Sequence, residues 1–155
     1  MIALAAPPLR SWIRPELVLP DLAATSANEV LTALAQVLSD ANPAVRSEQA
    51  QLAFLEREHL GSTGVGEGCA IPHCRLAGLN GLMLVVARTG AGVEFGAADG
   101  RLVRLFFGLA APTGAATQHL QVLSSIARWL RDRARCEALL AAPDRTAMVE
   151  ILSAD

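Results

Sequence analysis

The stretch GLMLVVARTGAGVEFGAADGRLVRLFFGLA, residues 81–110, decides the fold that we expect for this chain of 155 residues. It contains two continuous apolar runs of strand length, 81–89 and 102–110. Apolar runs without polar alternation are typical of strands that are covered on both faces of a sheet. The Asp-Gly pair at 99–100 is typical of a hairpin turn, so we expect residues 93–95 to pair antiparallel with the following strand. The stretch therefore predicts a mixed sheet between two helical layers.

Helical periodicity is found on either side of this stretch. Ser26 and Glu29 form a capping box, and Gly61 is typical of the position after a helix end. The expected helices cover 26–40, 47–60, a segment after Pro112 with His119 in its first turn, 133–141 and 144–153, and a short strand or extended lead-in covers 16–19. This order predicts an α/β (α+β) fold. We expect a three-layer sandwich, with a mixed β-sheet flanked by helices on both faces, as a single domain over 1–155.

Composition and charge exclude several classes of protein. The chain is 52% hydrophobic and 18% charged with a net charge of −2, which argues against general nucleic-acid or membrane-surface binding. No apolar run reaches the roughly eighteen residues of a membrane span. In residues 1–20 the positive charges follow the apolar stretch, contrary to a signal peptide. Because the three cysteines have no framework spacing, we expect a reducing, cytoplasmic setting.

The segment GSTGVGEGCAIPHCR, residues 61–75, contains side chains that could bind a ligand or take part in a reaction. Its glycine spacing is neither a dinucleotide fingerprint nor a P-loop. Glycines permit close approach of the backbone to a ligand, and successive N–H groups can cradle an anion. Ser62, Thr63 and Gly64 are therefore candidates for phosphate binding. Arg57, one helical turn earlier, offers a forked cationic donor.

Two histidines complete the candidate site. His73 follows Pro72 at what we expect to be the end of a brief apolar strand, where functional residues of open sheets are common. A neutral imidazole with one ring nitrogen fixed by a hydrogen bond can attack a phosphoryl group. Phosphoryl transfer then depends mostly on positioning and on donors for the phosphoryl oxygens. His119 is placed to lie beside His73 and donate to phosphate.

The residues alone leave other interpretations open. Most lone histidines are structural or exposed, and His59 fits the exposed end of its helix. The glycines fit a tight loop, and Arg57 fits a surface position in an acidic run. Cys69, His73 and Cys74 also suggest a metal site, but strand alternation places Cys74 opposite His73 and no Cys-x-x-Cys pair exists.

The stretch REHLGSTGVGEGCAIPHCR, residues 57–75, resembles the active-site signature of a known family. This family comprises enzyme IIA components of the fructose/mannitol type in the bacterial phosphoenolpyruvate-dependent phosphotransferase system, including its nitrogen-regulatory branch. The resemblance extends over VEFGAADGRLVRLFFGLAAP (93–112) and HLQVLSSIARWLRD (119–132). It implies a mixed sheet flanked by helices. It also implies no cofactor, since the phosphoryl group comes from phosphoenolpyruvate through partner proteins, and the spacing described above leads us to expect no metal.

The resemblance also implies roles for individual residues. His73 is the residue phosphorylated by the histidine phosphocarrier protein HPr, His119 is the second active-site histidine, and Arg57 binds phosphate. Ser62 and Thr63 match the Ser-Thr pair beside the site. The implied partners are an HPr-type protein and either an enzyme IIB or a regulated target protein.

Two residues depart from the family pattern. Cys69 replaces a branched aliphatic residue, and Cys74 replaces the small residue after the histidine, which raises the question of slower transfer, altered partner choice or oxidation. No fused HPr or IIB domain is found in the sequence, and GVGEGCAIPHCRLAGL (64–79) is closer to the nitrogen branch. We therefore expect a regulator rather than a sugar-transport IIA. A binding module without phosphotransfer is the alternative from another class.

Overall fold

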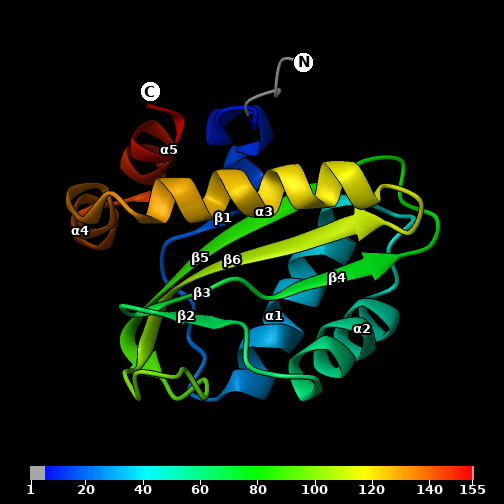
Figure 1. Ribbon diagram of the computed structural model, residues 1–155, viewed down its shortest axis with the longest axis horizontal. Helices are drawn as coiled ribbons and strands as arrows, with labels where there is room; N and C mark the ends of the chain where they lie inside the picture. The colour runs from blue at the N-terminus through cyan, green and yellow to red at the C-terminus, as the bar shows by residue number, and fades with distance from the viewer. Residues whose placement is uncertain (1–5, 155) are drawn as a thin grey trace, which may run out of the picture.

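The computed structural model describes residues 6–154 and has three layers, with a sheet between two groups of helices (Figure 1). Two 3-10 turns, Leu9–Trp12 and Pro15–Leu17, lead into strand β1. The strands are β1 (Val18–Leu19), β2 (Gly64–Gly66), β3 (Cys69–Ala70), β4 (His73–Leu76), β5 (Met83–Val93) and β6 (Val103–Pro112). The helices are α1 (Ala27–Ala41), α2 (Ser47–His59), α3 (Ala116–Leu130), α4 (Arg133–Ala141) and α5 (Arg145–Ser153). Residues 1–5 and 155 lie outside the described residues. Residues 1–5 are part of the segment used to argue against a signal peptide, and all of them are part of the single domain expected over 1–155.

The sheet is mixed, as the sequence predicts. Its order is β1-β5-β6-β3-β2, and β4 also pairs with β6. Strands β5 and β6 run antiparallel, whereas β1 is parallel to β5, and β3 and β4 are parallel to β6. The two long apolar runs of the sequence are thus the central pair of strands.

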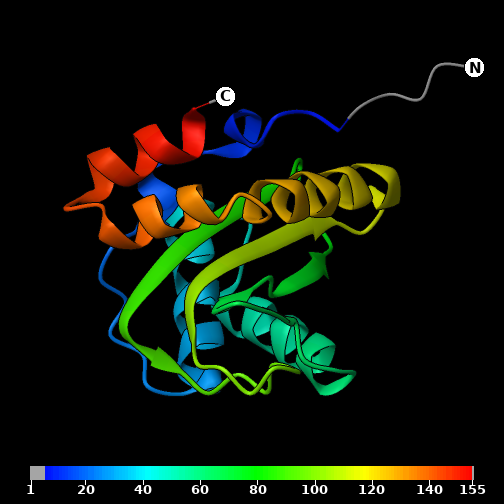
Figure 2. The same ribbon diagram turned by 60° about the vertical axis from the view of Figure 1, so that its left-hand side comes forward.

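The two helical layers bury opposite faces of this central pair, as Figure 2 shows from the side. Phe106 of β6 packs in the cluster with Leu34 and Phe54 from α1 and α2, and the next residue, Phe107, packs with Ile126 of α3 in the other cluster. Burial on both faces explains why these strands lack polar alternation. Among the described helices, none combines the length and the apolar character needed to cross a membrane.

Strands β3 and β4 form one interrupted line along β6. Cys69 pairs with Leu105 and His73 pairs with Leu109, so the register is kept across the gap. The interruption falls at Pro72, which has no N–H to donate, although its carbonyl accepts a bond of 2.8 Å from the Leu109 N–H. His73 therefore begins β4 within this line, and the expectation that it ends a strand was wrong.

The connection between β5 and β6 is longer than the predicted hairpin. Val93 pairs with Val103, but Val93 is the last residue of β5, and residues 94–102 form a loop. The Asp-Gly pair lies in a turn closed by a bond of 3.0 Å from the Gly100 N–H to the Ala97 carbonyl. The expected pairing of residue 95 was therefore wrong, because the turn closes within the loop rather than between the strands.

Most helix boundaries agree with the sequence patterns. The Ser26 hydroxyl accepts a bond of 3.1 Å from the Glu29 N–H at the start of α1. The Glu29 carboxylate does not return to Ser26, as a capping box requires, but accepts from the N–H and hydroxyl of Thr25. Asp132 and Asp144 cap α4 and α5 in the same way as Ser26 caps α1.

Candidate functional site

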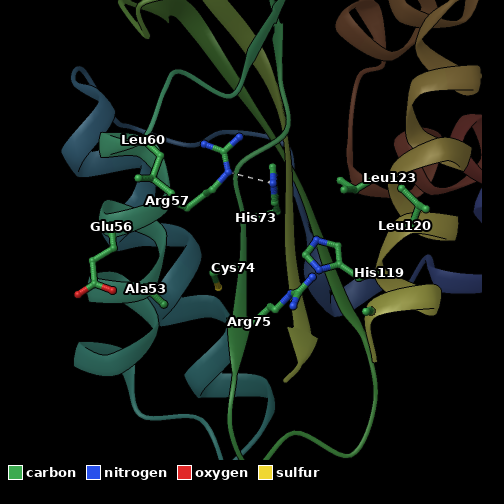
Figure 3. A pocket seen from close by; sticks show the side chains of 11 residues that line it. Ala53, Glu56, Arg57, Leu60, His73, Cys74, Arg75, His119, Leu120 and Leu123 are labelled. Carbon is green, nitrogen blue, oxygen red and sulfur yellow. Dashed lines mark hydrogen bonds between the residues drawn. The ribbon is translucent and has the colours of Figure 1, made fainter. Parts of the chain in front are cut away.

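A hollow of about 670 Å³ lies between α2, β4 and α3 (Figure 3). The two helices belong to opposite layers of the sandwich, and the composite β3–β4 strand runs between them. The polar side chains that line the hollow are Glu56, Arg57, His73, Arg75 and His119, and its apolar lining includes Leu60, Leu120 and Leu123. The structure thus brings together three of the predicted site residues, one from each of the three elements.

His73 is held with a defined tautomer. Its Nδ1 lies 2.8 Å from the Ile71 carbonyl oxygen, and its Nε2 lies 3.2 Å from Nε of Arg57. A carbonyl only accepts and a guanidinium only donates, so Nδ1 carries the proton and Nε2 accepts. Both bonds are satisfied by the neutral imidazole, and its Nε2 lone pair is the potential nucleophile.

Arg57 is oriented by the loop that follows α2. Its Nη1 donates a bond of 2.9 Å to the Gly61 carbonyl while its Nε donates to His73. The loop is fixed in turn by Glu58, whose carboxylate accepts bonds of 2.7 Å and 2.6 Å from the N–H and hydroxyl of Thr63. The end of the helix therefore both supplies the arginine and fixes its direction.

His119 lies in the first turn of α3 and faces His73. The two rings meet edge to face, with centroids 5.5 Å apart and planes at 79°. The residue is only 6% exposed, yet neither ring nitrogen has a hydrogen-bond partner. Buried polar atoms without partners are rare in native proteins and need a specific explanation. His119 therefore has unused hydrogen-bonding capacity beside the hollow that its side chain lines.

Both histidines are poised to stay neutral. Burial lowers the pKa of His73 below its usual value, and the charges of Arg57 and Arg75 lower it further against the opposing effects of a backbone carbonyl and Glu58. Burial also lowers the pKa of His119, and the charges of His73 and Arg75 add to this effect. An imidazole whose pKa lies below 6.5 is mostly unprotonated at neutral pH, as nucleophilic attack requires.

The other predicted phosphate-binding residues lie beside the hollow rather than in its lining. The Ser62 hydroxyl donates to the Phe95 carbonyl at 2.6 Å and accepts from the Gly64 N–H at 3.0 Å. A side chain at Gly64 would place its Cβ 2.9 Å from that of Ala97, so the loop is packed closely there. Direct contact of Ser62, Thr63 and Gly64 with phosphate stays a prediction, and the donors of this loop are engaged within the chain.

Arg75 is a site residue that the sequence analysis did not single out. It is exposed and lines the hollow from β4, two residues after His73. Side chains two apart on a strand point to the same face. The strand alternation that separates Cys74 from His73 also predicts that Arg75 joins His73, so this rule was sufficient to identify it.

The two unusual cysteines lie in different cores. Cys74 is buried in the cluster beneath α1 and α2, and burial raises its pKa to about 12. A thiol with such a pKa is neither a ready nucleophile nor easily oxidised. Cys69 is buried in the opposite cluster. Within residues 6–154, no three His, Cys, Asp or Glu side chains form a group that could hold a metal ion.

The chain is similar in sequence and in fold to known proteins. Residues 11–155 match the family described as "Phosphoenolpyruvate-dependent sugar phosphotransferase system, EIIA 2". The nitrogen regulatory protein of Bradyrhizobium diazoefficiens is 37% identical over 147 residues, which cover 94% of this chain and 95% of that protein. The crystal structure of nitrogen regulatory protein IIA-Ntr from Neisseria meningitidis matches with a TM-score of 0.85 and 29% identity, covering 93% of this chain and 98% of that one. The complex of enzyme IIAMTL and phosphorylated enzyme IIBMTL from Escherichia coli matches with a TM-score of 0.75 and 26% identity, covering 91% of this chain and 96% of that one.

Proposed function

Because the chain belongs to the EIIA 2 family of the phosphoenolpyruvate-dependent sugar phosphotransferase system, we propose that it is a phosphohistidine carrier of the nitrogen-regulatory type. The observation that carries the proposal is the state of His73. A backbone carbonyl holds its Nδ1–H, and its Nε2 lone pair lies in a hollow with a second histidine and two arginines. This is the arrangement that a neutral nitrogen nucleophile for phosphoryl transfer needs.

The reaction that we propose transfers one phosphoryl group between two imidazoles. The Arg57 Nε–H gives up its hydrogen bond to His73 Nε2 and turns to a phosphoryl oxygen. The freed Nε2 lone pair of His73 forms a new N–P bond as the N–P bond of the phosphorylated donor breaks. The donor imidazole leaves with the bonding electron pair. Positive charge that develops on the His73 ring is stabilised by the Ile71 carbonyl at Nδ1–H, while Arg57 and His119 donate to the phosphoryl oxygens.

We propose an HPr-type phosphocarrier as the donor. Large apolar side chains flank the hollow, with Leu60 of the α2 end 85% exposed and Leu120 of α3 68% exposed. Exposed apolar residues grouped around a reactive site are typical of a surface that another protein covers. Such docking brings a donor histidine to His73, and we propose that the exchange takes place in the cytoplasm and needs no cofactor.

For the next step we propose a regulated target protein, because two of the three similar proteins reported above are named nitrogen regulatory proteins. The IIAMTL complex with phosphorylated IIBMTL supports the second candidate, transfer to an enzyme IIB in sugar transport. The two candidates differ in where the phosphoryl group goes. A regulator retains it until its donor or water removes it, whereas a transport component loses it rapidly to purified IIB.

The test of the carrier function is phosphorylation in a reconstituted system. The protein is incubated with phosphoenolpyruvate, enzyme I and an HPr-type protein, and phosphohistidine is located by mass spectrometry. We expect acid-labile phosphate on His73 and none in His73→Ala. His59→Ala is the matched control, since His59 is exposed and lies outside the hollow, and we expect full labelling of that variant.

A protein that takes no acid-labile phosphate, or a His73→Ala variant that labels as well as the wild type, would overturn the proposal. A second outcome would point to the binding module without phosphotransfer. In it the protein takes no label, and the wild type, His73→Ala and His73→Asp all bind the target with the same affinity. Regulation by phosphorylation instead predicts that these two variants differ in target affinity by about tenfold or more, the size of a typical coupling between two sites.

A further inference from the structure

Arg75 presents an unused cation to the reactive histidines. Its side chain is exposed in the hollow and extends toward His119 in Figure 3. Within the described part of the chain, no hydrogen bond or ion pair engages its guanidinium. Other exposed arginines pair with a carboxylate, as Arg14 does with Glu16 at 2.6 Å and Arg133 with Glu67 at 3.3 Å. Arg75 instead lies among groups that carry no negative charge, apart from Glu56 at the α2 side of the hollow.

The position of Arg75 on the strand keeps it close to the nucleophile. His73 and Arg75 project from the same face of β4, with their backbones about 7 Å apart, a distance that an arginine side chain spans. The charge of Arg75 lowers the pKa of both His73 and His119, after the larger effect of burial. A group whose charge reaches both rings also reaches a phosphoryl group bound between them.

The charge of a bound phosphoryl group requires more than Arg57 can offer. A phosphoryl group carries about −1.5 to −2 charges near neutral pH and has three acceptor oxygens. Arg57 is a single cation, and its Nη1 is already bonded to the Gly61 carbonyl. His119 is neutral and offers one N–H. The site as described so far therefore leaves part of the negative charge without a partner.

We propose that Arg75 is a phosphoryl-binding residue, which pairs with the phosphoryl group on His73 from the α3 side while Arg57 contacts it from the α2 side. This inference rests on the proposed carrier function. The planar fork of arginine matches two oxygens of the group at once. Arg75 thereby stabilises the phosphorylated form over the unphosphorylated form. Phosphorylation of His73 also neutralises the charge of Arg75 in the hollow between the exposed side chains of Leu60 and Leu120.

The test compares Arg75→Gln with Arg75→Lys and with a control, Arg131→Gln. Arg131 is likewise exposed, but it lies at the end of α3 and outside this hollow. Each protein is phosphorylated with phosphoramidate, a small donor whose P–N bond breaks as the His73 N–P bond forms, releasing ammonia. The ³¹P resonance is assigned to His73 by its loss in His73→Ala. Its pH titration reports the pKa of the phosphoryl group.

We expect Arg75→Gln to raise the phosphoryl pKa, because a nearby cation favours the dianion. We also expect it to lower the equilibrium ratio of phosphorylated to unphosphorylated protein, measured near pH 8 against a fixed donor ratio, by about three- to fivefold, the worth of a partly exposed ion pair. In the unphosphorylated variant the pKa of both histidines rises, while the groups that face them, Arg57 and Glu58, are unchanged. Arg75→Lys keeps the charge and most of each effect.

A phosphoryl pKa and an equilibrium ratio that are the same in Arg75→Gln, Arg131→Gln and wild type would overturn the inference. The two proposals fail in different ways. Normal phosphorylation by phosphoramidate without any transfer from the HPr-type donor contradicts the carrier function and leaves the Arg75 result to stand on its own. A His73 that accepts from neither donor overturns both.

Discussion

His119 shows a conflict between stability and function at a single residue. Its ring is almost fully buried and both nitrogens lack partners, so the folded state loses hydrogen bonds that water provides in the unfolded state. Selection for stability alone favours an apolar residue at such a position. Local violations of this kind are expected at functional sites. The ring lies against His73, where a ligand oxygen could accept the unpaired N–H. Ligand binding would then recover the hydrogen bond that folding loses.

We predict that His119→Leu stabilises the fold and weakens phosphorylation of His73. The free energy of unfolding rises by about 1 kcal/mol at neutral pH, because a desolvated polar group is removed. The gain grows as the pH falls below 6.5, because the lowered pKa of His119 means that the unfolded wild type binds the proton more readily than the folded protein does. Chemical denaturation at several pH values measures this slope. His59→Leu, which removes a histidine at an exposed position outside the hollow, is the matched control. A slope in His119→Leu that equals the slope of the wild type would contradict the prediction.

The sequence is sufficient to single out three candidate site residues that lie together, but it does not predict the hydrogen bonds of the loop beside them. Arg57 and His73 stand in the 57–75 motif and His119 in the second matching stretch at 119–132, and the structure places these three residues together. The partner of the Ser62 hydroxyl is a carbonyl in the loop at Phe95, which is distant in the sequence. Side-chain bonds to remote backbone depend on the tertiary structure, so no local pattern predicts them.

At the scale of elements, the glycine-rich stretch forms a hairpin between β2 and β3. Gly66, Glu67 and Gly68 all have positive φ, at 88°, 60° and 78°. A two-residue hairpin turn of this hand requires positive φ at both central positions, which glycine adopts without strain. The tip is fixed by a bond of 2.8 Å from the Glu67 N–H to the Asp99 carboxylate. Gly66 and Gly68, two of the four glycines of the segment, are thus explained by the positive φ of the hairpin and need no phosphate contact.

We predict that Gly68→Ala lowers the free energy of unfolding by roughly 1–2 kcal/mol, the cost of a left-handed conformation for a residue with a side chain. The cause is the φ of 78° and not a collision, because an added Cβ would only reach ordinary contact, 3.6 Å from the Leu102 carbonyl oxygen. Gly81→Ala is the control, since Gly81 has open space around it and no positive φ. Denaturant unfolding measures the free energy of unfolding of both variants. Equal values for Gly68→Ala and Gly81→Ala would refute the role of φ.

The periodic elements are predictable because their causes are local, and the irregular ones are not. The helices follow from apolar spacing and from caps such as Ser26, and each of the five lies where its pattern predicts. The break between β3 and β4 depends on Pro72 pairing across to β6, so only the sheet register shows that both pieces share one line. The same holds for the Asp-Gly turn, whose distance from the strand ends is set by the packing of the whole 94–102 loop.

At the scale of the whole molecule, a buried arginine joins the sheet to the last two helices. Arg88 of β5 is 8% exposed, and its Nη1 donates to the carbonyls of Leu139 at 2.8 Å and Ala142 at 2.7 Å, where α4 ends. Its Nε donates to the Pro20 carbonyl at 3.0 Å. Within residues 6–154 no carboxylate pairs with this guanidinium, so its charge is balanced by the negative end of the α4 dipole and by carbonyl oxygens.

We predict that Arg88→Met lowers the free energy of unfolding by roughly 3 kcal/mol, because several buried carbonyls lose their donor at once. Arg145→Met is the matched control: Arg145 is exposed, and among residues 6–154 it donates one bond, of 2.9 Å, to the Val18 carbonyl, so we expect a loss of about 1 kcal/mol or less. Hydrogen exchange of Arg88→Met loses protection first in α4 and α5, while the histidine hollow, which is built from α2, β4 and α3, stays protected and still accepts a phosphoryl group. Equal melting of the two variants, or loss of protection that begins at the hollow, would show that Arg88 does not hold the C-terminal helices on the sheet.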